Sequence, residues 1–127
     1  MTEDIVHKIA SALSGALEAP VDDRAVTAYR VETPGSTDYY YLAFFTPVGG
    51  SLRGFILGAD FSVRQSAVMD SAPDLSRPSS ATRLVWKPCR VSYSPFYPFW
   101  EVGAPEGMRY VDLKGRVFMG LEEGRGG

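Results

Sequence analysis

The residues of this chain that could act as nucleophile or general base are few and far apart in the sequence. The chain has one histidine, His7, and one cysteine, Cys89. Nucleophilic catalysis needs a base within hydrogen-bonding reach of the nucleophile, and nothing in the sequence brings these two together. His7 falls on the polar side of a predicted helix, so we expect it to be solvated. Cys89 lies in an apolar strand pattern and is interpreted as a buried, unreactive thiol.

Metal chemistry is also poorly supported. One histidine and one cysteine cannot form the usual nitrogen and sulfur cage of zinc. Glu18, Asp22 and Asp23 lie close together in sequence, but their spacing does not match a calcium-binding loop. No glycine-rich phosphate loop, nucleophile elbow or dinucleotide fingerprint is present. We therefore expect no metal and no cofactor.

Carboxylates leave one catalytic alternative open. Asp60, Glu101 and Asp112 fall on or beside predicted strands, where burial would raise the pKa of a carboxyl group. The sequence does not pair any two of them, and paired acids are what glycosidic or proton-transfer chemistry requires. The residues therefore favour a protein without intrinsic catalysis.

The most distinctive pattern of the chain is aromatic. Segment 93–100 combines two prolines with five aromatic residues, namely Tyr93, Phe96, Tyr97, Phe99 and Trp100. Prolines are excluded from central strands, and one short helix could not cover all five rings. Exposed contiguous aromatics mark interaction surfaces, so these residues are predicted to bind a partner. In the alternative, Phe96 and Trp100 complete the core while Tyr93 and Tyr97 cover its edge.

A second hypothesis places a small-molecule pocket or active site between helix and sheet. Gly54 and Gly58 fall on one face of a predicted strand, and such glycines mark the close approach of another group. The helix packing there is the ordinary explanation, and a ligand is the alternative. Tyr39, Tyr41 and Trp100 would line such a pocket. The Ser- and Pro-rich segment 70–82 would close it as a lid, or would serve only as a linker.

The elements that must position these residues begin with one amphipathic helix over residues 3–18. Ile5, Ile9, Leu13 and Leu17 recur at every fourth position and form an apolar stripe. Thr2 is a suitable N-cap, and Pro20 ends the helix because the residue before a proline is pushed out of helical geometry. One face of this helix must therefore be buried against an apolar surface.

The rest of the chain has the alternation and turn chemistry of short strands. Turns are predicted at 34–38, 47–51 and 60–62, and Asp112 with Gly115 fits a type I turn closed by a glycine bulge. Strands are predicted over 24–33, 39–46, 52–59, 63–69, 83–93, 108–113 and 116–121. We therefore predict an α+β fold in which the N-terminal helix packs on a mostly antiparallel, strongly twisted meander of about six to eight strands.

A single domain over residues 1–121 is expected, followed by a frayed tail over 122–127. The pattern Trp100-Glu101-Val102 with Tyr110–Asp112 and Gly115–Val117 resembles the last hairpin of PepSY-type domains. Its residues are those that hairpins in general favour. The similarity therefore identifies a hairpin and does not assign the chain to that family.

Charge and composition limit the partners. The formal net charge is −2 and the isoelectric point is near 5.3, so neither nucleic acid nor an anionic membrane is an expected target. Residues 1–23 are mostly acidic and residues 76–116 mostly basic. Two solvated faces that attract each other are the favoured interpretation, because surface charges contribute little, and a basic strip that meets an acidic partner is the alternative. The start of the chain lacks the features of a secretory signal, and no apolar run has transmembrane length. We expect a cytoplasmic bacterial protein.

The favoured function is that of a binding or accessory protein that uses the aromatic segment as a homodimer or protein-partner interface. The small-molecule binder or enzyme described above is the alternative. A secretion chaperone or adaptor is a further alternative, because such proteins share the acidic charge and the helix-on-sheet layout.

Overall fold

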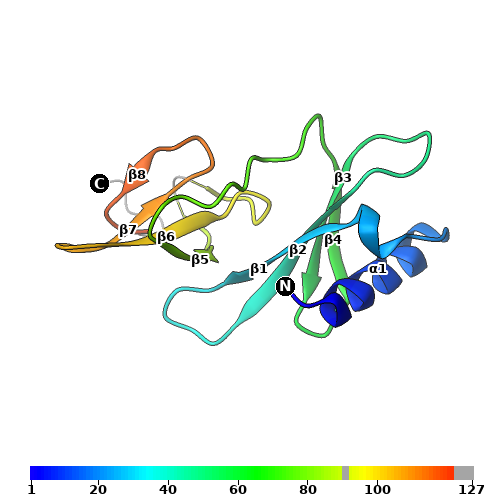
Figure 1. Cartoon of the computed structure of the whole chain (residues 1–127), viewed down its shortest axis with the longest axis horizontal. Coiled ribbons are helices and arrows are strands. Elements are labelled where there is room, and N and C mark those ends of the chain that lie inside the picture. The colour runs from blue at the N-terminus through cyan, green and yellow to red at the C-terminus, as the bar shows by residue number, and fades with distance from the viewer. Residues whose placement is uncertain (90–91, 122–127) are drawn as a thin grey trace. The chain divides into compact units, whose positions relative to one another are not determined.

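The computed structural model describes residues 1–89 and 92–121 (Figure 1). The predicted tail, 122–127, lies outside the described residues, as do Arg90 and Val91. In chain order the elements are α1 (Glu3–Leu17), the 3-10 helix η1 (Asp23–Ala25), β1 (Thr27–Glu32), β2 (Tyr39–Phe45), β3 (Arg53–Gly58), β4 (Val63–Val68), β5 (Ala81–Val85), β6 (Phe99–Ala104), β7 (Gly107–Val111) and β8 (Val117–Phe118).

The described strands form an eight-stranded sheet in the order β4-β3-β2-β1-β5-β6-β7-β8. Of the strand pairs whose register is defined, only β1 with β5 is parallel. The predicted α+β class, with one N-terminal helix on a mostly antiparallel sheet, is confirmed. The parallel pair was not predicted from the sequence. It sets Val31 beside Leu84, residues that are far apart along the chain.

The chain divides into two compact units. The first comprises residues Met1–Arg30 and Tyr39–Ala72, and the second comprises Val31–Asp38 and the chain from Pro73 onward. The boundary after Ala72 falls inside the Ser- and Pro-rich segment 70–82. This segment therefore connects the two units along the chain.

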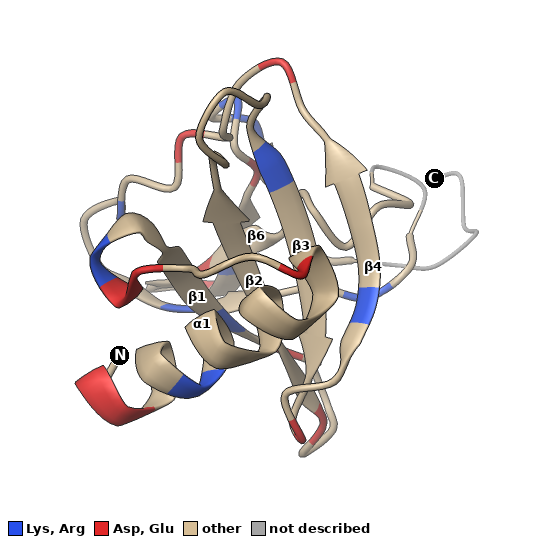
Figure 2. Cartoon of the chain, turned by 90° about the vertical axis from the view of Figure 1, so that its right-hand side faces the viewer, with Lys and Arg blue, Asp and Glu red and all other residues tan. Residues whose placement is uncertain are grey.

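In the first unit, α1 packs on β2 and β3 through the predicted apolar stripe (Figure 2). The helix begins after Thr2, whose Oγ1 accepts a hydrogen bond from the Ile5 N–H at 3.3 Å. Glu3 and Asp4 occupy the first turn, where the positive end of the helix dipole favours carboxylates. The buried core between helix and sheet consists of Ile9, Ala10, Leu13, Val26, Tyr41, Ala43, Phe45, Phe55 and Leu57.

The helix lies on the Phe55 face of β3, not on the glycine face that the sequence suggested. Phe55 and Leu57 belong to the helix–sheet core, and successive side chains of a strand point to opposite faces. Gly54 and Gly58 therefore lie on the other face of the sheet. A Cβ on Gly58 would meet the guanidinium of Arg64, which occupies this place.

In the second unit, β5, β6, β7 and β8 form an antiparallel ladder. One face of it carries a buried cluster of Val85, Cys89, Phe99 and Leu121, with Phe118 packed against it. The rings of Phe99 and Phe118 meet edge to face at 6.0 Å between centroids. This cluster supports the residues that form the candidate site.

The predicted strand over 83–93 is shorter than expected. Strand β5 ends at Val85, and Cys89 and Ser92, among the described residues that follow, form an isolated bridge. Pro88 explains this difference, because it cannot donate a hydrogen bond to the ladder. With the strand ended, Trp86 packs against the same cluster as Val85 instead of facing the opposite side.

Candidate binding site

The first wall of the candidate site is the turn between β7 and β8. The Gly115 N–H donates to the Asp112 carbonyl at 3.1 Å, and Gly115 has a φ of +85°, a conformation that glycine adopts without strain. The Asp112 carboxylate accepts from the Lys114 N–H at 2.9 Å and from the Arg116 N–H at 2.8 Å. The predicted type I turn with a glycine bulge is thus confirmed, and it fixes the direction of Lys114 and Arg116.

Asp112 and Arg116 also form an ion pair within this turn. The Arg116 Nε–H donates to Asp112 Oδ2 at 2.6 Å, and the Asp112 side chain is only 12% exposed. Burial raises the pKa of Asp112, but the hydrogen bonds from Arg116 and Lys114 and the Arg116 charge outweigh it and lower the pKa below its ordinary value. Asp112 is therefore ionised at neutral pH.

The second wall is the loop that carries the aromatic segment. The Ser92 hydroxyl lies 3.2 Å from the Ser94 carbonyl oxygen and 3.1 Å from the Tyr97 carbonyl oxygen, to which it can donate. The Tyr97 N–H donates to the Ser94 carbonyl at 3.1 Å, which closes a tight turn. Ser94 Oγ in turn accepts from the Phe96 N–H at 3.3 Å. Ser92 and Ser94 thus hold the loop in the shape that displays Tyr93 and Tyr97.

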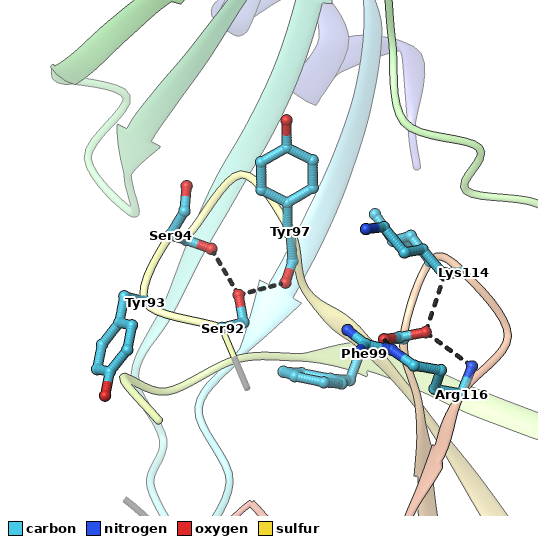
Figure 3. A pocket seen from close by; sticks show the side chains of 9 residues that line it. Ser92, Tyr93, Ser94, Tyr97, Phe99, Lys114 and Arg116 are labelled. Carbon is cyan, nitrogen blue, oxygen red and sulfur yellow. Dashed lines mark hydrogen bonds and ion pairs between the residues drawn. The ribbon is translucent and has the colours of Figure 1, made fainter. Parts of the chain in front are cut away.

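Between these two walls lies a recess of about 440 Å³. It is lined by Ser92, Tyr93, Ser94, Tyr97, Phe99, Asp112, Leu113, Lys114 and Arg116. Figure 3 shows the loop residues on one side and Lys114 with Arg116 on the other, with the Phe99 ring at the base. All of these residues belong to the second unit. The volume lies in the range of ordinary ligand pockets, about 300–1,000 Å³.

The five aromatic residues predicted to bind a partner divide into two groups. Tyr93 is 73% exposed and Tyr97 is 48% exposed, and both line the recess. Phe96, Phe99 and Trp100 are buried. The alternative prediction, in which Phe96 and Trp100 complete the core, describes their burial correctly. Of the three buried rings, only Phe99 also lines the recess.

The residues predicted to line a helix–sheet pocket do not surround a common space. Tyr41 is buried in the core under α1 and stacks on Phe61 at 5.2 Å between centroids. Tyr39 meets the Tyr41 ring edge to face, and the Arg30 guanidinium lies 3.9 Å from the centroid of the Tyr39 ring. Gly54 and Gly58 lie on the opposite face of the sheet. Tyr39 and Tyr41 therefore lie on the face that α1 covers, and the two glycines lie on the other face.

The candidate catalytic groups each contact residues near them in the sequence or in the same unit. His7 is exposed, with Nδ1 3.0 Å from the Asp23 carboxylate, so the expected solvation is confirmed. Cys89 is buried, and its Sγ lies 3.5 Å from the Ser92 carbonyl oxygen, to which it can donate. A side-chain hydrogen bond from Ser62 lowers the pKa of Asp60 below its ordinary value. The raised pKa considered for Asp60 and Asp112 is therefore wrong.

Glu101 is the third of these carboxylates, and it is engaged in an ion pair. Glu101 is buried in β6, and its Oε1 accepts from Arg83 Nε at 2.9 Å. The Arg83 guanidinium also reaches Glu32, at 3.5 Å. This ion cluster is thus best understood as a connection between the side chains of β1, β5 and β6.

No three His, Cys, Asp or Glu side chains within 1–89 and 92–121 are grouped so that they could hold a metal ion. In the same described ranges, no helix has the length and apolar character needed to cross a membrane.

We compared the chain with protein-family models, curated proteins and solved structures, and none of them matches.

Sequence reasoning singled out Tyr93, Tyr97 and Phe99, whereas it included Lys114 and Arg116 only in the basic stretch 76–116 and did not place them beside the aromatic segment. The turn that carries these two cations was recognised, yet only as a hairpin. The sequence contains no indication that residues 112–116 lie opposite residues 92–97, because this contact depends on how the chain passes between β5 and β6.

Proposed function

We propose that this chain is a binding protein without catalysis of its own, and that it recognises a protein partner through the recess between residues 92–97 and 112–116. The observation that carries the proposal is the exposure of Tyr93 and Tyr97 at the rim of this recess. Tyrosine is enriched at the energetic centres of interfaces because it offers a large, rigid contact area and a polar end.

The hydrogen bonding of the two tyrosine hydroxyl groups supports the proposal. Neither the Tyr93 nor the Tyr97 hydroxyl has a hydrogen-bond partner among the described residues. In Figure 3 the Tyr97 phenol points away from the Phe99 ring. Exposed apolar surface with unused polar ends is typical of a contact surface. The Ser92 and Ser94 hydrogen bonds hold the loop in place beforehand, which lowers the entropy cost of binding.

The proposal can be tested by photo-crosslinking of the full chain in the cells that produce it. The photoreactive amino acid p-benzoylphenylalanine would replace Tyr97 in one variant and Val48 in a control variant. Val48 is fully exposed and belongs to the first unit. We expect a discrete crosslinked adduct from the position 97 variant and none from the position 48 control. The mass of the adduct distinguishes a second copy of this chain from a different protein.

The adduct would then be checked with purified components. Replacing both Tyr93 and Tyr97 with serine is expected to weaken binding at least about tenfold, because a central interface tyrosine contributes more than about 1 kcal/mol. The Val48→Ser control should bind as the wild type does. The proposal fails if position 97 gives no specific adduct, or if the double variant binds its partner unchanged.

A further inference from the structure

We infer that the segment recognised by this recess carries an acidic side chain next to a large apolar side chain. This inference rests on the proposed function and names the chemistry of its partner. The carboxylate would pair with Lys114 and Arg116, and the apolar side chain would enter the recess over Phe99. The charges on the wall of the recess and the size of the recess support this pairing.

Lys114 carries a positive charge that nothing in the described residues neutralises. Its backbone N–H donates to Asp112, but its Nζ makes no ion pair or hydrogen bond with any described residue. The side chain extends from the fixed turn at the wall of the recess (Figure 3). An unpaired cation held beside an aromatic recess favours an anionic group on the incoming molecule.

Arg116 adds a guanidinium whose direction is already fixed. Its Nε is engaged by Asp112 at 2.6 Å, and its two terminal nitrogens make no hydrogen bond with the described residues. These nitrogens present N–H donors that suit a carboxylate. Asp112 offsets one of the two cations, so the wall keeps one positive charge in excess. Residues on the opposite wall, 92–97, carry no charged side chain.

The aromatic part of the recess favours an apolar side chain next to the carboxylate of the partner segment. The base of the recess is the Phe99 ring and its rim includes Tyr93 and Tyr97. A volume of about 440 Å³ accommodates one large side chain and its adjoining backbone, and not a folded element. The free phenol hydroxyls can donate to carbonyl groups of that backbone. An extended segment with one acidic and one apolar side chain fits these three features together.

The inference can be tested with the ¹⁵N-labelled full chain and short capped peptides that differ only at their two central residues. The peptides are acetyl-Gly-Gly-Glu-Phe-Gly-Gly-amide and its Gln-Phe, Lys-Phe, Glu-Ala and phosphotyrosine-Phe counterparts. We expect the Glu-Phe peptide to shift the amide resonances of Tyr97, Lys114 and Arg116. The Gln-Phe and Glu-Ala peptides should bind about fivefold more weakly, since each lacks one of the two contacts.

Charge reversal at Lys114 provides the sharper test. The variant Lys114→Glu should lose its preference for Glu-Phe and bind the Lys-Phe peptide better than the wild type does. Lys87→Glu makes the same change of charge in the same unit, outside the recess, and should behave as the wild type. Unchanged amide resonances away from the substituted residue would show that both variants are folded.

Several outcomes would overturn the inference. It fails if Gln-Phe binds as well as Glu-Phe, if Lys114→Glu and Lys87→Glu behave alike, or if no peptide shifts the recess resonances. It also fails if the phosphotyrosine peptide binds more tightly than Glu-Phe, because the recess would then select phosphate. None of these results bears on the crosslink at position 97, so the proposed function would stand or fall separately.

Discussion

Arg116 Nε lies 2.6 Å from Asp112 Oδ2. The same carboxylate also accepts hydrogen bonds from the backbone N–H groups of Lys114 and Arg116. One side chain thus closes the β7–β8 turn and orients the recess wall. Stability of the turn and geometry of the site are therefore linked through Asp112.

Replacing Asp112 with asparagine should lower the free energy of unfolding by about 1–2 kcal/mol, because a carboxylate that accepts three N–H groups becomes a weaker, neutral acceptor. Urea unfolding at pH 7 measures the difference. Glu106→Gln is the matched control, since the Glu106 carboxylate is 72% exposed in its pair with Arg109, and we expect about 0.5 kcal/mol or less. Equal losses in the two variants would contradict this role for Asp112.

The same substitution should change the pH dependence of stability. The pKa of Asp112 is lower in the folded chain than its ordinary value of 3.8. Its contribution is therefore complete above about pH 4 and is lost as the pH falls through the folded pKa. The difference in unfolding free energy between wild type and Asp112→Asn should shrink as the pH falls from about 4 to about 2. A difference that stays constant over this range would rule out the linkage.

Alanine should have opposite effects at Gly15 and Gly115. Gly15 lies inside α1, and no atom lies within 4 Å of the position that a Cβ would take there, so Gly15→Ala should stabilise the chain by about 0.5–1 kcal/mol. Gly115 has a φ of +85°, where a side chain costs about 1–2 kcal/mol. The shifts in thermal midpoint should have opposite signs. A destabilised Gly15→Ala variant would contradict the described end of α1.

Leu57→Ala should be the most damaging of the substitutions considered, because Leu57 is fully buried between β3 and α1, beside Tyr41. A cavity at such a position costs about 2–5 kcal/mol. Val68→Ala, at an exposed position of β4, should change the unfolding free energy by no more than about 0.5 kcal/mol. Chemical denaturation compares the pair, and similar losses would show that the helix does not pack on the Leu57 face.

The two ion pairs that Arg83 forms, with Glu101 and with Glu32, should contribute differently to stability. Glu101→Gln should cost about 1–3 kcal/mol, because the buried carboxylate accepts from Arg83 at 2.9 Å. Glu32→Gln removes a longer contact, 3.5 Å, between side chains that are each about one-third exposed, and should cost less than about 1 kcal/mol. A double-mutant cycle with Arg83→Met should give the larger coupling for Glu101. Equal coupling energies would contradict the described geometry.

The sequence by itself determined the local elements of this protein. The stripe of Ile9 and Leu13 is a property of neighbouring residues, and it predicted both α1 and its buried face. The Asp112 and Gly115 pair likewise specified its turn, because the required backbone conformation is local. The helix, the antiparallel hairpins and the fold class could be predicted for this reason.

Tertiary structure decided which faces meet and which residues form the recess. Alternation along β3 shows that Gly54 and Phe55 lie on opposite faces of the strand. Packing then decides which of these faces α1 covers. The Phe55 face is covered because its bulky side chains bury more apolar area against the helix than glycines would. The burial of Phe96 and Trp100 and the exposure of Tyr93 and Tyr97 also depend on distant strands. Lys114 comes to lie opposite Tyr97 through the same long-range contacts, which no pattern of neighbouring residues encodes.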